Sequence, residues 1–446
     1  MVLMSSTTLS KCSLPLLLAA AGVFPACAAS LSVVYNLTVQ NPFANGLLEG
    51  SPGLFYSRSG NDTIFTVTTK GTSATLVGFP TPPYGINGDP GALAANGLLY
   101  STLVNASTSA LSANVFSVSS TAGSEKFYAK QGLDADLVGN LPSGELFALA
   151  QGFTGGVPPV LATVDLKGAV TSFYQFSATD RPGIPIYSGD GNYYGVAGQA
   201  ISGATSYFYR VTPSGTFTNV ASLPFLSGGG FYGDGFVLQG TDGNFYGIQQ
   251  TGAGCAGGNQ HGAVYKLTPS GQFTILHDFG VCSKGVVNPL IEGSDGKLYG
   301  SRQDTNEIFS LTTSGTYSVV ASLSGTYGLC PCILLQGSDG KIYGGSTGGG
   351  STGYGTVFAL DAGLPIPKPR APAFYPKSGA AGTQVRIWGS NLFGASVQFN
   401  GVAATNVHNS GPNYIWATVP TGATTGPITI TTPGGTVTTK VSFLVQ

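Results

Sequence analysis

The stretch "QGSDGKIYGG" (residues 336–345) occurs almost unchanged upstream as "EGSDGKLYGS" (292–301). Related decamers are "QGTDGNFYGI" (239–248) and "YSGDGNYYGV" (187–196). In each decamer Asp-Gly favours a tight turn, and the flanking apolar and aromatic residues alternate with small or polar ones as they do in β-strands. The decamer therefore predicts a hairpin that is repeated along the chain.

The repeat extends over most of the sequence. Less regular copies lie at residues 49–58, 93–102 and 140–149, so that aromatic residues recur at intervals of 44 to 53 residues: Tyr56, Tyr100, Phe147, Tyr194, Tyr246, Tyr299 and Tyr343. After a loop of variable length each decamer is followed by a second alternating run, such as "AVYKLTPSG" (263–271), and by a further run such as "FTILHDF" (273–279). Each of the seven units thus predicts four antiparallel strands.

Units of this length, each forming one small sheet, are typical of β-propellers, because a single sheet must stack on its neighbours to bury its faces. The seventh unit ends at Gly363 without a fourth strand, while "LSVVYNL" (31–37) near the N-terminus resembles "YSVVASL" (317–323), the fourth strand of unit six. We predict an all-β fold: a seven-bladed β-propeller over residues 29–363, closed by the N-terminal strand. The alternative is an unrelated N-terminal strand.

Composition excludes several classes of protein. Only 8% of the residues are charged and the net charge is −1, which predicts no basic stripe for nucleic acid and no polybasic surface for anionic lipid. Residues 1–28 have the features of a signal peptide: Lys11, an apolar run at 14–24, and Ala-Cys-Ala at 26–28. The apolar run is shorter than the roughly 20 residues that span a bilayer. We expect a secreted or cell-surface protein without an integral membrane segment; lipidation of Cys27 is the alternative.

Four cysteines remain after the signal peptide: Cys255, Cys282, Cys330 and Cys332. Disulfides are the expected state in an oxidising compartment, with Cys255–Cys282 favoured and the other pairings left open. Zinc is the alternative, but there is no C-x-x-C pair and His261 is the only imidazole in a nearby loop. We therefore predict no metal and no cofactor.

The D-G-x-x-Y-G decamers and the V-F-K-L-T-P-S-G type of run resemble the GloVer tandem repeats of exported bacterial proteins. The resemblance is close in units four to seven and weak in units one to three. It implies a repeat architecture and export, and it supplies no catalytic residues.

The composition of the sequence changes after Gly363. "LPIPKPRAP" (364–372) predicts a stiff, extended linker, and residues 373–446 contain five short strand-like runs. "YPKSGAAGTQVRIWGSNL" (375–392), "VQFNGV" (397–402) and "ATVPTGATTGPITITTPGGT" (417–436) resemble IPT/TIG domains. The resemblance implies an immunoglobulin-like β-sandwich that acts as a spacer or a binding module.

Trp388 and Trp416 are the only tryptophans. Each has the opposite parity to the apolar residues of its strand, so both indoles are expected on the outer face of neighbouring strands. They form a candidate binding platform for sugar or protein. The alternatives are a cross-strand pair that stabilises the sheet and packing against the propeller.

Near the end of the first strand of each unit stands a residue that is polar in six of seven units: Glu49, Leu93, Asn140, Tyr187, Gln239, Glu292 and Gln336. First strands line the channel of a propeller, so we expect solvated polar groups around a tunnel. Glu49 and Glu292 could alternatively serve as the acid and base of a polysaccharide hydrolase or lyase.

The function predicted from the sequence is extracellular binding or cell-surface adhesion, with a carbohydrate or protein ligand. The glycine-rich loop at 252–262, which contains His261, and the cysteines are expected on the ligand face. A structural envelope component without a specific ligand is a further alternative, because propellers host many unrelated functions.

Overall fold

The computed structural model describes residues 29–38, 45–59, 63–78, 84–105, 113–121, 123–128, 135–150, 158–199, 205–226, 236–249, 262–279 and 286–446. Every regular element in these ranges is a β-strand. Accordingly, none of the described segments forms a helix that could span a membrane. The prediction of an all-β protein is confirmed.

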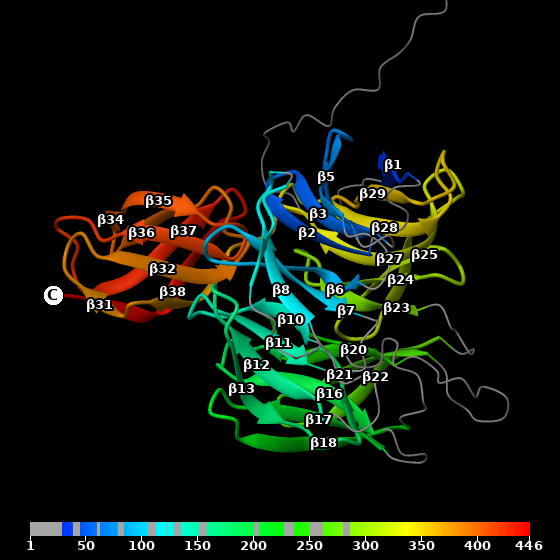
Figure 1. Ribbon diagram of the computed structural model, residues 1–446, viewed down its shortest axis with the longest axis horizontal. Coiled ribbons are helices and arrows are strands. Elements are labelled where there is room, and N and C mark those ends of the chain that lie inside the picture. Colours follow the sequence, from blue (N-terminus) through cyan, green and yellow to red (C-terminus); the bar gives the residue numbers. More distant parts are fainter. Residues whose placement is uncertain are drawn as a thin grey trace, which may run out of the picture.

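Strands β1–β29 form seven small sheets, here called the repeat sheets, in the order of the sequence units (Figure 1). The first three are β2 (Asn45–Ser51), β3 (Leu54–Ser59), β4 (Thr63–Thr68) and β5 (Ser73–Gly78); β6 (Tyr84–Leu93), β7 (Leu99–Asn105), β8 (Ala113–Val118) and β9 (Lys126–Phe127); and β10 (Ala135–Asn140), β11 (Leu146–Ala150), β12 (Val160–Val164) and β13 (Val170–Gln175).

The next three sheets are β14 (Asp180–Pro182), β15 (Ile186–Tyr187), β16 (Tyr193–Gln199), β17 (Thr205–Val211) and β18 (Phe217–Leu226); β19 (Val237–Gln239), β20 (Phe245–Gln249), β21 (Ala263–Leu267) and β22 (Phe273–Asp278); and β23 (Val286–Glu292), β24 (Leu298–Arg302), β25 (Glu307–Leu311) and β26 (Tyr317–Ser322). All strand pairs in these sheets are antiparallel, as the alternating runs and turn residues predict.

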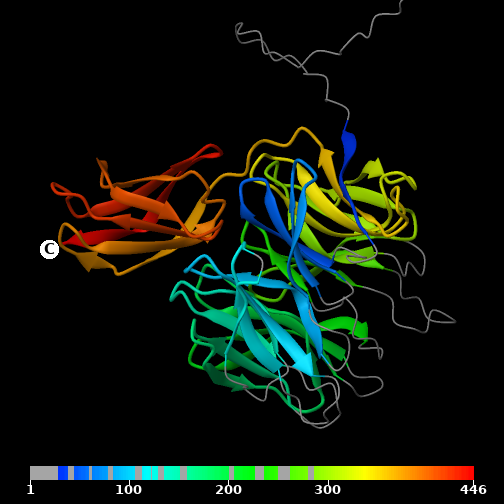
Figure 2. The same ribbon diagram turned by 45° about the horizontal axis from the view of Figure 1, so that its top comes forward.

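The last repeat sheet joins the two ends of the repeat region. It contains β27 (Leu329–Gln336), β28 (Ile342–Gly348) and β29 (Thr356–Asp361). Its fourth strand is the N-terminal β1 (Ser30–Asn36), which pairs with β29 from Ser30↔Asp361 to Asn36↔Thr356. Figures 1 and 2 show β1 beside β29. The N-terminal strand therefore takes the fourth position that the sequence of unit seven leaves empty.

Apolar side chains fill the space between consecutive repeat sheets. One cluster, for example, joins Ile64 and Val77 of the first sheet to Leu99 and Phe116 of the second. Another joins Phe55 of the first sheet to Tyr343 and Val357 of the last. Each sheet thus buries its faces against two neighbours, and the last sheet does so against the first.

The remaining strands form two further sheets, here called the C-terminal sheets. One has the order β30 (Arg370–Tyr375), β32 (Gln384–Ser390), β36 (Tyr414–Thr418), β35 (Thr405–Asn409); the other has β31 (Ser378–Gly379), β38 (Gly435–Val445), β37 (Gly426–Thr432), β33 (Ser396–Phe399), β34 (Val402–Ala403). Both contribute to one buried core, with Ile387 and Ile415 from the first and Phe399 and Ile430 from the second. Strand β30 begins at Arg370, within the segment predicted to be a linker.

Candidate functional site

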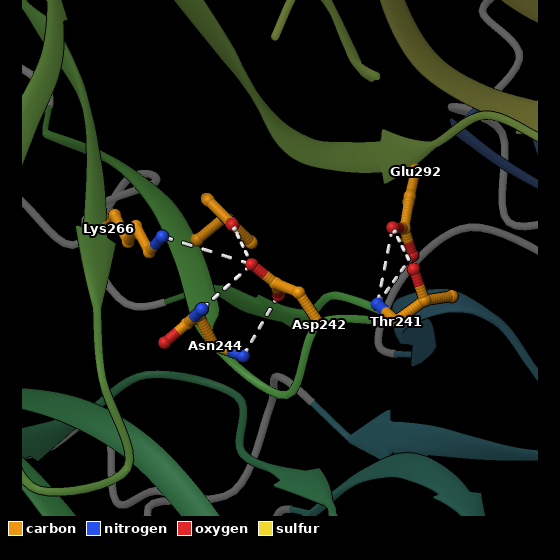
Figure 3. A network of polar contacts seen from close by, with 6 residues as sticks. Thr241, Asp242, Asn244, Lys266 and Glu292 are labelled. Carbon is orange, nitrogen blue, oxygen red and sulfur yellow. Dashed lines mark hydrogen bonds and ion pairs between the residues drawn. The ribbon is translucent and has the colours of Figure 1, made fainter. Parts of the chain in front are cut away.

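The aspartates of the D-G turns hold the turn and the aromatic residue of the next strand together. In Asp190, Asp242, Asp295 and Asp339 one carboxylate oxygen accepts the backbone N–H two residues later, and the other accepts the hydroxyl of the tyrosine four residues later at 2.7–3.1 Å. Figure 3 shows this arrangement around Asp242, with Asn244 and Lys266 beside the carboxylate. These aspartates form turns, and no cluster of three or more metal-ligating side chains occurs in the described ranges.

The pKa shifts of two of these aspartates agree with their role as hydrogen-bond acceptors in the turns. Partial burial disfavours the charge on Asp242, but hydrogen bonds from Asn244 and Tyr246 outweigh the burial and hold the pKa of this carboxyl below its ordinary value. The same balance lowers the pKa of Asp190. Both groups are therefore charged acceptors at neutral pH.

In four of the seven units, the polar residue near the end of the first strand binds the turn of the preceding sheet. The Glu292 carboxylate accepts the backbone N–H of Thr241 at 2.9 Å and its hydroxyl at 2.7 Å (Figure 3). Gln336 makes the corresponding contact one sheet later, since its amide oxygen accepts the N–H of Ser294 at 2.9 Å. These contacts, here called turn clasps, join the end of the first strand of one sheet to the turn that follows the first strand of the preceding sheet.

Two more clasps extend the series in both directions. Gln239 accepts the hydroxyl of Ser188 at 3.0 Å. Glu49 of the first sheet accepts the N–H of Ser338 at 2.8 Å and its hydroxyl at 2.7 Å, which joins the first sheet to the last. These side chains thus connect neighbouring sheets. Glu49 is buried and is not the solvated group expected at this position, whereas Gln239, Glu292 and Gln336 are half-buried.

Glu49 is the most enclosed member of the series. It is 6% exposed and also accepts the backbone N–H of Gly53 at 2.9 Å. Burial raises the pKa of this carboxyl, although the hydrogen bonds from Gly53 and Ser338 oppose the rise. Glu49 and Glu292 are bound to different turns, each by two or more hydrogen bonds, so the structure does not bring them together as an acid and base pair.

The turns of units two to four hold the C-terminal sheets. Tyr414 donates its hydroxyl to the carbonyl of Leu141 at 2.8 Å, and Arg386 donates to the carbonyl of Pro142 at 3.0 Å. The guanidinium of Arg386 also lies 5.5 Å from the centre of the Trp416 ring. The sheet containing β32 and β36 therefore packs against the turns between the first and second strands of the repeat sheets.

The two tryptophans belong to this contact. Trp388 pairs with Tyr414, and Arg386 pairs with Trp416, so both indoles share one face as their parity predicts. Trp416 donates its indole N–H to the carbonyl of Ala95 at 3.3 Å, and the Trp388 ring lies edge-on to Tyr187 at 5.7 Å. Both are half-buried against the repeat sheets, which corresponds to the packing alternative and leaves no freely exposed platform.

The linker also contacts the turns. The carbonyl of Pro365 accepts the hydroxyl of Ser294 at 2.5 Å and the side-chain amide of Gln336 at 3.3 Å. Residues 364 and 365 of the predicted stiff, extended linker thus lie over the turns of units six and seven.

Other predicted site residues fall partly outside the description. His261, Cys255 and Cys282 lie outside the described residues, as does the side chain of Cys330. Cys332 is buried in β27 and its thiol donates to the carbonyl of Gly345 at 3.3 Å. The predicted Cys255–Cys282 bridge and the role of His261 stay predictions.

Residues 181–363 match the family model of the Gloeobacter/Verrucomicrobia repeat. Comparison with curated proteins gave no match. Among solved structures, a streptogramin B lyase is similar at a TM-score of 0.53 and 13% identity, covering 75% of this chain and 98% of its own. A virginiamycin B lyase from Staphylococcus aureus, crystallised with quinupristin, gives the same TM-score and identity over 74% of this chain and 99% of its own. At such identity the likeness concerns the fold alone, which is propeller-like.

Proposed function

We propose that the chain is an exported binding protein, built as a seven-bladed β-propeller over residues 29–363 with an IPT/TIG immunoglobulin-like domain over 373–446. The pairing of β1 with β29 and the apolar cluster between the first and last repeat sheets support a closed ring. The core common to the two C-terminal sheets supports the sandwich. The signal-like residues 1–28 support export.

The observation that favours binding over catalysis is that the repeats use their polar side chains in turn clasps. Carboxylates that each accept two or more hydrogen bonds from a neighbouring turn are poorly placed to transfer protons to a substrate. We therefore rank the alternative of a polysaccharide hydrolase or lyase using Glu49 and Glu292 below binding. A structural envelope component without a ligand remains the second candidate, since the clasps suit a rigid scaffold equally well.

The ligand face in this proposal is the end of the sheets opposite the clasped turns. In a four-stranded antiparallel sheet, the loop between strands two and three and the connection to the next sheet emerge at that end. These segments differ in length and sequence from unit to unit, as binding loops do, and they include residues 252–262. The C-terminal sheets contact the turns at the other end. The expected ligand is a carbohydrate or a protein.

The test is a glycan array and a pull-down from envelope fractions with the mature chain. A first variant replaces residues 252–261 by a short Gly-Ser turn and carries Cys282→Ser. A matched control carries only Cys255→Ser and Cys282→Ser, which separates loss of the loop from loss of a bridge. Retention of a ligand by the wild type and the control, but not by the loop variant, supports the proposal. Absence of any ligand, or equal binding by all three proteins, contradicts it and leaves the scaffold role.

A further inference from the structure

The charges of the chain are divided between its two parts. All 19 acidic residues precede Gly363, whereas residues 364–446 contain five basic residues and no Asp or Glu. The net charge of −1 is a sum over both parts, and it therefore hides the excess of basic residues in the C-terminal part. Arg386 faces the repeat turns; the other four basic residues are exposed: Lys368, Arg370, Lys377 and Lys440.

The four exposed cations lie along one seam of the C-terminal sheets, where residues 366–379 run beside β38. At one end of this basic seam, Lys368 packs against Gly435, with its Cγ 3.7 Å from the position of a Cβ there. At the other end the carbonyl of Lys377 accepts the N–H of Leu444 at 3.0 Å, and Ser378 pairs with Leu444. Residues 364–446 are all described by the structure, and none of the four cations among them forms an ion pair with a carboxylate.

Large apolar side chains are exposed on the same basic seam. Val441 is 54% exposed, Leu444 53% and Ile366 39%, and Tyr375, which shares a sheet face with Arg386, is 64% exposed. They are four of the eight large hydrophobic residues that are exposed in the described part of the chain. In Figure 1 β31 and the C-terminus lie at the end of the C-terminal sheets that points away from the repeat sheets, so this end of the seam is not covered by them.

We propose that the basic seam docks on an anionic membrane surface. The four cations would contact lipid phosphates, while Val441 and Leu444 enter the boundary between headgroups and acyl chains. Attraction by several basic residues and shallow insertion of a few apolar ones are each weak, and reversible peripheral binding needs both. An acidic polysaccharide or a nucleic acid would use the cations but leave Val441 and Leu444 in water, which is why a lipid surface fits better. This inference does not depend on the ligand of the loop face.

The test is co-sedimentation of the mature chain with vesicles. Vesicles of phosphatidylcholine mixed with phosphatidylglycerol should bind the protein, and vesicles of phosphatidylcholine alone should bind it much less. Raising the salt from about 0.1 M to about 1 M shortens the Debye length from about 10 to about 3 Å and should release it. Lys377→Ser with Lys440→Ser should weaken binding by about fivefold for each cation removed.

Two matched controls make the result specific to the basic seam. Lys70→Ser with Lys297→Ser removes two cations from turns of the repeat sheets and should leave binding unchanged. Val441→Ser with Leu444→Ser should weaken binding about tenfold or more, whereas Ile275→Ser with Val319→Ser, on outer strands β22 and β26, should not.

Several results would overturn the inference. These are no binding by the wild type, equal binding to both kinds of vesicle, or an equal loss in a control pair. The wild type could also fail to bind vesicles but associate with itself, and the Lys377→Ser, Lys440→Ser variant could lose this self-association. That result would show that the basic seam binds a second copy of the chain instead of a membrane.

Discussion

Replacing Glu49 by leucine tests the clasp that joins the first repeat sheet to the last. The carboxylate is 6% exposed and accepts three hydrogen bonds, from the N–H of Gly53 and from the N–H and hydroxyl of Ser338. Leucine has a similar volume but accepts none of them. A hydrogen bond to a charged group contributes about 1.5–3 kcal/mol, and relief of the buried charge offsets part of the sum. We expect the free energy of unfolding to fall by about 2–3 kcal/mol.

Glutamine at the same position should cost much less, about 1 kcal/mol at most. Gln336 already makes the equivalent contact, because its amide oxygen accepts the N–H of Ser294. The assay is urea unfolding of the mature chain, followed by tyrosine and tryptophan fluorescence. The half-exposed Glu292, replaced by leucine, is the matched control and should cost less than the Glu49 change because water can reach its donors.

A pH series separates ionisation from packing, because only ionisation of Glu49 makes the difference in stability depend on pH. Burial raises the pKa of Glu49 above the ordinary value of 4.5. The folded state therefore binds this proton more tightly than the unfolded state, and the stability contributed by Glu49 is complete below pH 4.5 and lost as the pH rises through the raised pKa. Glutamine does not titrate, so Glu49→Gln should gain on the wild type between pH 4.5 and neutral pH. A difference that stays flat across this range, or equal losses for Glu49→Leu and Glu49→Gln, would refute the reasoning.

Two further predictions concern the contacts between parts. Gly315 has a φ of +100°, and a Cβ there would lie 2.7 Å from a backbone carbonyl oxygen of the preceding sheet, whereas Gly296 has a φ of +79° and no atom within 4 Å of its Cβ position. Gly296→Ala should lower the free energy of unfolding by about 1–2 kcal/mol, and Gly315→Ala should lower it by about 1–3 kcal/mol more. Equal costs of the two substitutions would contradict the close packing at Gly315. Arg386→Ala with Trp416→Ala removes two hydrogen bonds to the repeat turns; trypsin should then cut after Arg370 about tenfold faster, and an unchanged rate would show that these contacts do not hold the C-terminal sheets.

Much of the fold could be predicted from the sequence because it depends on local rules. Asp-Gly turns and alternating runs specify hairpins within a few residues. The N-terminal strand could be matched to unit seven since "LSVVYNL" resembles the fourth strand of unit six, and the observed pairing of Tyr35 with Val357 agrees with that match. The parity of Trp388 and Trp416 likewise predicted that they share a face.

Contacts between units could not be predicted in the same way. Whether Glu292 points into a channel or onto Thr241 depends on the stagger of two neighbouring sheets, which no local pattern encodes. The covering of the tryptophan face depends on where the C-terminal sheets dock, more than 200 residues away in sequence from Pro142. The division of charge, by contrast, is visible in the sequence once the two parts are counted separately instead of together.

The units that lack a turn clasp are those that contact the C-terminal sheets. Units five, six, seven and one end their first strands with Gln239, Glu292, Gln336 and Glu49, and each of these clasps the preceding turn. Units two, three and four have Leu93, Asn140 and Tyr187 instead, and there the turns receive the C-terminal sheets: Gly411 lies against Leu93, Tyr414 binds Leu141, and Trp388 packs on Tyr187. A carboxylate or a Gln amide in place of Leu93 or Tyr187 would compete with the docked residues for the same turns, whereas Asn140 keeps an amide one methylene shorter beside the docked Tyr414. Loss of the clasp residue in units two and four therefore accompanies docking of the C-terminal sheets. Regularity of the whole decamer does not follow the docking, since unit four is regular and covered, whereas unit one is irregular and uncovered.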